Sequence, residues 1–148
     1  MHKPEERPVE THYIQKLLAR YGASLHTELH MENGVCALQD ERGRELAVLE
    51  LPPPGEMLML HCLILPADPA WQTPAMLQTL LTMNFEIGAM DGCWLALDQE
   101  RNLRLCGRSA LSQLDHTGFA LLLNGFIERG HQVRDFMPDL LERLRPVA

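Results

Sequence analysis

The sequence has 148 residues, the usual size of one domain, and 46% of them are hydrophobic, which is enough for a full core. With only four Phe, two Tyr and two Trp, Leu and Met must fill most of that core. The net charge of −7 and the absence of a Lys/Arg cluster argue against a nucleic-acid-binding domain, which needs a basic face for phosphates.

The sequence also lacks the segments that target a protein to a membrane. No apolar run reaches the roughly 18 residues of a membrane helix, and the longest, Met57–Leu65, contains His61. The first twelve residues lack the apolar region of a signal peptide. We therefore expect a bacterial cytoplasmic protein with no membrane insertion. In that reducing compartment the four scattered cysteines are expected to be free thiols, without a metal role.

Residues 1–10 carry several charges and two prolines, so we expect a flexible N-terminal tail. A short amphipathic helix is predicted to follow, with Thr11 as its N-cap and Gly22 at its C-terminal end. Four apolar residues recur at helical spacing between them. They are Ile14, Leu17, Leu18 and Tyr21.

Apolar and polar residues alternate from Leu25 to Met31, which is typical of a strand with one polar face. Asn33-Gly34 is the strongest hairpin signal in the sequence, because both residue types tolerate positive φ. Strands are predicted at Val35–Asp40 and Glu45–Leu51, and a glycine-containing turn joins them.

The prolines at 52–54 end the preceding strand, because proline cannot donate to a strand ladder. The next predicted strand, Met57–Leu65, is apolar on both faces. Such a strand is either covered on both sides, or covered on one side and open to a partner on the other.

A second helix is predicted to begin after Thr73, the N-cap, with Pro74 in its first turn. Its apolar residues spread around most of the circumference instead of forming one stripe. They are Met76, Leu77, Leu80, Leu81, Met83 and Phe85. Periodicity leaves two arrangements open: the helix is enclosed within the domain, or its outer side meets a second chain.

A hairpin of Cys93–Asp98 and Leu103–Arg108 is predicted next, followed by a third helix that begins at Asp115 or Thr117. We expect Pro138 to end or kink this helix and residues 138–148 to form an extension that can add a last helical turn. Gly125 and Gly130 within the helix indicate close packing. The predicted domain spans residues 11–137.

No catalytic motif is present: the sequence has no G-x-S-x-G, phosphate-binding loop or H-E-x-x-H. His26, Glu28 and His30 share one face of the predicted strand, so a metal or acid–base site is possible there, although a solvated face is favoured. His61, inside an apolar strand, is interpreted as a core histidine with a satisfied hydrogen bond.

A set of residues, in this order and spacing, resembles the class I chaperones of bacterial type III secretion, the Tir chaperone (CesT-like) family. The set comprises Leu65-Pro66, then Leu77, Leu80, Leu81 and Met83-Asn84, then Gly88 and Gly92, then Trp94–Asp98, then Leu103 and Leu105, then Leu111–Asp115, and finally Phe119, Leu123 and Phe126. The resemblance covers roughly residues 11–136. No single motif is specific to the family.

The resemblance implies an α+β fold: a twisted antiparallel sheet with three helices in the order α-β-β-β-α-β-β-α, assembled as a homodimer. It implies a chaperone without enzymatic activity, cofactor or ATP use, which keeps the N-terminal region of secreted effectors extended and delivers it to the secretion apparatus. The implied dimer interface contains Met76, Leu80, Met83 and Trp94. The implied effector-binding residues are Ile14, Leu17, Leu18, Leu29, Val35, Leu49 and Leu60.

The secretion ATPase is a further candidate partner of such a chaperone. A regulator or adaptor of the same fold, which binds a secretion component, is the alternative function. A small enzyme that uses the histidine face or a Cys–His pair is a third.

Overall fold

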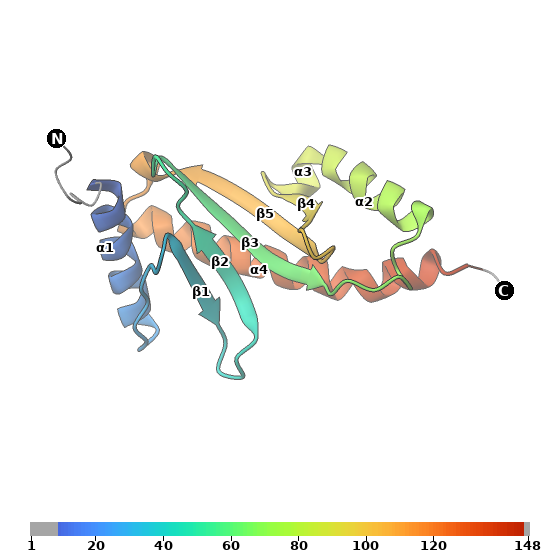
Figure 1. Cartoon of the computed structure of the whole chain (residues 1–148), viewed down its shortest axis with the longest axis horizontal. Coiled ribbons are helices and arrows are strands. Elements are labelled where there is room, and N and C mark those ends of the chain that lie inside the picture. Colours follow the sequence, from blue (N-terminus) through green and yellow to red (C-terminus); the bar gives the residue numbers. More distant parts are fainter. Residues whose placement is uncertain (1–8, 147–148) are drawn as a thin grey trace.

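The computed structural model of the chain describes residues 9–146, so most of the expected N-terminal tail lies outside the described residues. The helices and strands follow one another along the chain as shown in Figure 1. They are α1 (Val9–Ser24), β1 (Val35–Gln39), β2 (Glu45–Glu50), β3 (Met57–Leu65), α2 (Pro74–Phe85), α3 (Ile87–Met90), β4 (Trp94–Leu97), β5 (Leu103–Ala110), the 3-10 helix η1 (Leu111–Gln113) and α4 (His116–Arg143). This confirms the predicted α+β class and element order; the short helices α3 and η1 were not predicted.

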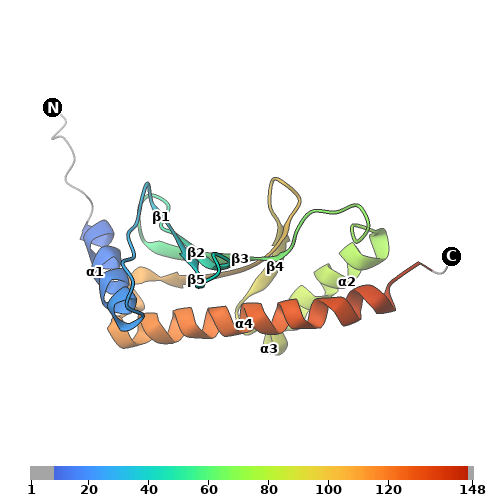
Figure 2. The ribbon, with the colours of Figure 1, turned by 90° about the horizontal axis from the view of Figure 1, so that it is seen from below.

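The strands form one antiparallel sheet in the order β1-β2-β3-β5-β4. The long helix α4 runs along one face of this sheet, as Figure 2 shows, and α1 lies at the end of the sheet near the start of α4. None of the described helices covers the opposite face, which we call the open face. The helices thus cover a single face of the sheet.

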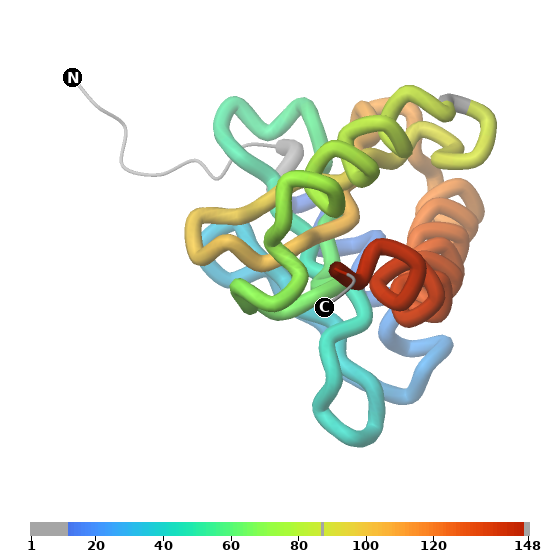
Figure 3. The backbone as a smooth tube through the Cα atoms, turned by 90° about the vertical axis from the view of Figure 1, so that its right-hand side faces the viewer, coloured from blue at the N-terminus to red at the C-terminus, as the bar shows by residue number. Residues whose placement is uncertain are grey.

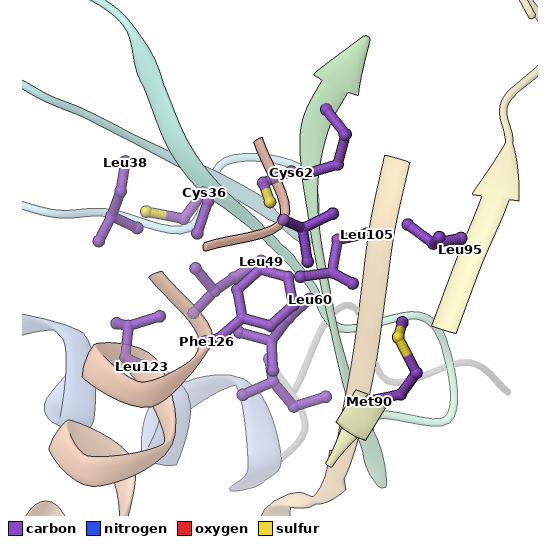
Figure 4. Packing of buried hydrophobic residues seen from close by; sticks show 14 of the residues in the cluster. Cys36, Leu38, Leu49, Leu60, Cys62, Met90, Leu95, Leu105, Leu123 and Phe126 are labelled. Carbon is purple, nitrogen blue, oxygen red and sulfur yellow. The ribbon is translucent and has the colours of Figure 1, made fainter. Parts of the chain in front are cut away.

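The core lies between the sheet and α4. Along β3, Leu58, Leu60, Cys62 and Ile64 are buried, while the residues between them are only half-buried or exposed. Figure 4 shows side chains of the sheet gathered around Phe126 of α4. Of the two arrangements left open for the apolar strand β3, the structure has the second: β3 is covered on one face and offers the other to solvent.

Glycines in α4 and β5 set how closely these elements pack. A Cβ atom at Gly130 would lie 3.0 Å from the Sγ atom of Cys62, and one at Gly107 would lie 3.4 Å from the ring of Phe126. A Cβ atom at Gly125 would meet no atom within 4 Å. The expected close packing is therefore confirmed at Gly130 and was wrong at Gly125.

The predicted limits of the first helix were wrong. Helix α1 already includes Val9, so Thr11 is not its N-cap, and the helix continues past Gly22 to Ser24. The carbonyl oxygen of Gly22 accepts hydrogen bonds from the backbone N–H groups of Leu25 (3.0 Å) and Thr27 (2.9 Å), which turns the chain sharply after the helix.

The predicted strand from Leu25 to Met31 was also wrong. This segment is irregular, because a side chain takes the place of a neighbouring strand. The amide of Gln15 in α1 donates to the carbonyl oxygen of Leu29 at 3.0 Å and accepts from the N–H of Met31 at 3.0 Å. The segment therefore packs against α1 outside the sheet.

The predicted starts of the other two helices are confirmed. The hydroxyl oxygen of Thr73 accepts from the N–H of Met76, and a carboxylate oxygen of Asp115 accepts from the N–H of Gly118 at 2.6 Å. Helix α4 does not end at Pro138, however, and continues to Arg143. Pro138 is exposed, so water can bind the carbonyl group that loses its helical partner.

Candidate functional site

Helix α2 exposes large apolar side chains although its inner side is buried. Met76 and Leu80 are buried, whereas Leu81 is 71% exposed and Phe85 is 83% exposed. The helix contains no charged residue. Figure 3 shows that α2 lies at the outside of the molecule. The single chain therefore does not enclose this helix, and its outer side is available to a second chain.

The C-terminal end of α2 is fixed to the sheet by Asn84. Its side-chain amide donates to the carbonyl oxygen of Leu95 at 2.9 Å and accepts from the N–H of Leu95 at 2.7 Å. One side chain thus pairs with the outer edge of β4 much as a strand would. This pairing holds the exposed side of α2 in a defined orientation relative to the sheet.

The predicted dimer residues lie on or beside α2 but mostly on its inner side. Met76 and Leu80 are buried within the chain, and Met83 and Trp94 are half-buried. The residues that sequence reasoning missed are Leu81 and Phe85. Their i, i+4 spacing places them on one side of the helix, but periodicity does not tell which side faces solvent.

The predicted effector-binding residues divide into a buried and an accessible group. Ile14, Leu17, Leu18, Leu49 and Leu60 belong to the core and are at most 1% exposed. They offer no surface to a partner in this structure, because the apolar stripe of α1 packs inward. Leu29 is half-buried and Val35 is 37% exposed, so both remain accessible.

The outer edge of β1 is free for pairing at Ala37. The N–H and C=O groups of Val35 bond to Glu32, so they point away from β2. Because peptide groups of alternate residues in a strand point the same way, those of Ala37 also point away from β2. Within β1, Ala37 thus presents an N–H and a C=O at the edge of the sheet without a backbone partner in the described part of the chain, a feature that extended peptides can use.

A shallow groove of about 380 Å³ lies between α1 and the irregular segment before β1. Its lining includes Ala19 and Ala23 of α1 and Leu29, with His26, Glu28 and His30 along the rim. The ring of His30 lies 3.7 Å from the carboxylate of Glu28, and both side chains are largely exposed. His30 and Glu28 therefore form a solvated surface pair, and their exposure differs from the buried environment of an acid–base site.

The interpretation of His61 as a core histidine was wrong, because its side chain lies on the open face. There it accepts a hydrogen bond at Nδ1 from Nε of Arg104 at 2.9 Å, and its Nε2 atom lies 3.5 Å from the carboxylate of Glu50. Arg104 also binds Glu45 at 2.5 Å and lies 3.8 Å from Asp98. A network of charged and polar side chains therefore crosses β2, β3 and β5 on the open face and reaches Asp98 in the loop after β4.

Residues 9–146 contain neither a metal-binding cluster nor a membrane-spanning helix. No group of three or more His, Cys, Asp or Glu side chains there is placed to hold a metal ion. No helix in that range is both long and apolar enough to cross a membrane.

Comparison with known proteins gives one family and several structures. The model of the Tir chaperone protein (CesT) family matches residues 13–134. The structure of the ExsC–ExsE complex matches with a TM-score of 0.71 at 17% identity, over 93% of this chain and 97% of the other. The HopA1–SchA chaperone–effector complex matches with a TM-score of 0.67 at 19% identity, over 86% and 97%.

The Yersinia pestis type III secretion chaperone SycH, solved with a stable fragment of YscM2, matches with a TM-score of 0.58 at 15% identity, over 82% of this chain and 98% of the other. At these identities the structures show a shared fold. A search among curated proteins found no significant match.

Proposed function

Because this chain belongs to the Tir chaperone protein (CesT) family, we propose that it is a type III secretion chaperone that binds the N-terminal region of one or more effector proteins. In this proposal it keeps that region extended and delivers it to the secretion apparatus, where the secretion ATPase is a candidate partner. The protein acts by binding, without catalysis. The proposal rests on one observation: the single chain leaves both apolar surface and backbone hydrogen-bonding groups without a partner.

The first such surface is the outer side of α2, which we assign to a two-fold homodimer. Leu81 and Phe85 of one protomer pack against the same surface of its partner, as a self-complementary interface requires. The uncharged sequence of α2 supports this, since no charge has to be desolvated when the two copies meet. Met83 and Trp94, both half-buried, lie at the margin of this interface.

The second surface is the free edge of β1 together with the groove beside α1, which we assign to the effector. An extended segment adds a strand through the peptide groups of Ala37, and its apolar side chains contact Val35 and Leu29. Backbone pairing makes little demand on sequence, so several different effectors can be held in the same way.

A substitution at Ala37 tests the assignment to the β1 edge. Ala37→Pro removes the outward N–H group but leaves the bonds between β1 and β2 in place, because proline is tolerated on an edge strand. Ala37→Val at the same position keeps the N–H and is the matched control. The probe is the N-terminal region of a secreted protein of the native cell, chosen by its co-purification with this chain, and binding is measured by titration calorimetry.

We expect the proline variant to lose at least about tenfold in affinity, which corresponds to about 1.4 kcal/mol, and the valine variant to bind like the original. Equal affinity of all three proteins would remove the β1 edge from the binding site. No binding by any of them, with several such secreted proteins as probes, would overturn the proposed function.

A further inference from the structure

The open face of the sheet contains a trough that neither the dimer surface nor the β1 edge includes. Its volume is about 660 Å³, and it extends from β2 to the loop between β4 and β5. Its apolar lining consists of Val48, Ala96, Leu97 and Cys106. Leu97 is exposed, and Ala96 and Cys106 are only half-buried. Val48 is buried, and His61 and Arg104 also line the trough, so the apolar surface open to a partner's side chains lies mainly at Ala96, Leu97 and Cys106.

The rim of this trough is acidic. Glu45, Glu50, Asp98 and Glu100 line it, against the single guanidinium of Arg104. Arg104 is shared between Glu45 and Asp98, so it neutralises at most part of this charge. Four carboxylates against one guanidinium leave three excess negative charges among the lining residues.

The carboxylate of Asp98 is held in its charged form by the loop that forms one wall. Partial burial by itself would raise its pKa, but the N–H groups of Asn102 and Glu100 and the Asn102 amide donate to it. These hydrogen bonds and the charge of Arg104 keep the pKa of Asp98 below its usual value. Asp98 therefore keeps its negative charge in the folded protein at neutral pH.

A second copy of this chain is a poor occupant. The exposed helix α2 has no charged residue with which to pair the acidic rim, and the chain as a whole carries a net charge of −7. Bringing a copy to this rim would set like charges against each other. A segment with both apolar and cationic side chains can contact the apolar residues of the trough and also pair with its carboxylates.

We propose that this trough binds a short extended segment of the effector in which Lys or Arg residues alternate with apolar residues. The inference rests on the proposed chaperone function and adds a second, charge-selective contact to the one at β1. With strands spaced about 4.8 Å apart, crossing from β2 to β4 covers roughly 14 Å, the length of four or five extended residues. The apolar side chains lie on Ala96 and Cys106, and the cations reach Glu50 and Glu100.

The test uses a fluorescein-labelled heptapeptide of alternating Val and Lys, with the peptide of alternating Val and Glu as the control ligand. Binding is followed by fluorescence anisotropy at low ionic strength. One variant carries Glu50→Gln and Glu100→Gln on the rim. The matched variant carries Glu128→Gln and Asp135→Asn, two exposed positions of α4 outside the trough lining, and removes the same formal charge.

We expect the Lys peptide to bind and the Glu peptide not to bind. The rim variant is expected to weaken binding about fivefold, because it removes two exposed ion pairs with the peptide, whereas the α4 variant should change binding less than about twofold. A benzophenone group in the Lys peptide should crosslink to β4 or β5. Equal losses in both variants would mean attraction by net charge alone and would overturn the proposal.

Sedimentation of the rim variant tests whether a second copy of the chain, and not the effector, occupies the trough. A change in its oligomeric mass would show that the trough belongs to a contact between copies and would also overturn the proposal. If the rim variant binds the Lys peptide normally while Ala37→Pro still blocks effector binding, only the trough assignment fails. If neither variant loses effector binding, both site assignments fail, whereas failure of the original protein to bind any effector would overturn the proposed function itself.

Discussion

Replacing Leu81 and Phe85 together by Ser should separate the proposed dimer into folded protomers. Fully burying a Leu or Phe side chain contributes roughly 1.5–3 kcal/mol relative to leaving it in water. These two side chains are 71% and 83% exposed in the single chain, and a two-fold interface contains each of them twice. The four side chains together therefore contribute roughly 5–9 kcal/mol, so the double variant should weaken the dimer at least about a thousandfold.

Sedimentation equilibrium at micromolar concentration measures this change, and far-UV circular dichroism checks that the protomer remains folded. Because Leu81 and Phe85 make few contacts within the chain, the helix content should not change. Leu121→Ser on α4 is the matched control, since Leu121 is 69% exposed, and it should remain dimeric. A double variant that still sediments as a dimer would refute the assignment of α2 to the interface, as would a control that dissociates.

Three further predictions concern single positions. Gly22→Ala should destabilise the protein by about 1–3 kcal/mol, because its Cβ would lie 2.6 Å from a backbone carbonyl oxygen, whereas Gly125→Ala should stabilise α4 by about 0.5–1 kcal/mol. Urea unfolding measures both changes, and the opposite ranking of the two variants would contradict the packing described. Asn84→Asp removes a donor and places a carboxylate against the carbonyl oxygen of Leu95, so we expect the free energy of unfolding to fall by about 1–3 kcal/mol in the same assay. Unchanged stability would show that this pairing does not hold α2. Burial raises the pKa of the Cys62 thiol to about 11, so about one thiol in a thousand is ionised at pH 8. Iodoacetamide should therefore label Cys62 only in urea. Rapid labelling of the native protein, detected by mass spectrometry, would be inconsistent with that burial.

The order of helices and strands could be predicted because its signals are local. Thr73 and Asp115 cap helices through their own side chains, and the positive φ of Asn33 and Gly34 follows from the residue types at that turn. Such features depend on a few neighbouring residues, which a sequence displays directly.

The strand expected at Leu25–Met31 failed for a reason that lies outside the segment. Its alternation is real, but the backbone groups of Leu29 and Met31 bond to the side chain of Gln15, which belongs to α1. The side-chain amide of Gln15, which is distant in the sequence, thus determines the conformation of this segment. Alternation describes which residues share a face and does not supply a neighbouring strand.

The site residues were harder to predict than the fold, because periodicity groups residues by face without telling what covers each face. The stripe with Leu17 and Leu18 was assigned to a partner, yet it packs against the core of its own chain. On α2 the inner residues Met76 and Leu80 were chosen, while the exposed Leu81 and Phe85 were not. The acidic trough joins β2 to the β4–β5 loop and becomes visible only when the sheet is assembled.

The most direct test of the chaperone account is the mass of the complex, measured by native mass spectrometry after co-expression with the N-terminal region of a secreted protein that co-purifies with this chain. The account predicts two copies of the chain with at least one effector segment bound, and hydrogen exchange in the same sample that protects the Ala37 amide while most effector amides exchange freely. A single copy that carries the effector, or a dimer whose bound effector is protected throughout like a folded domain, would contradict it.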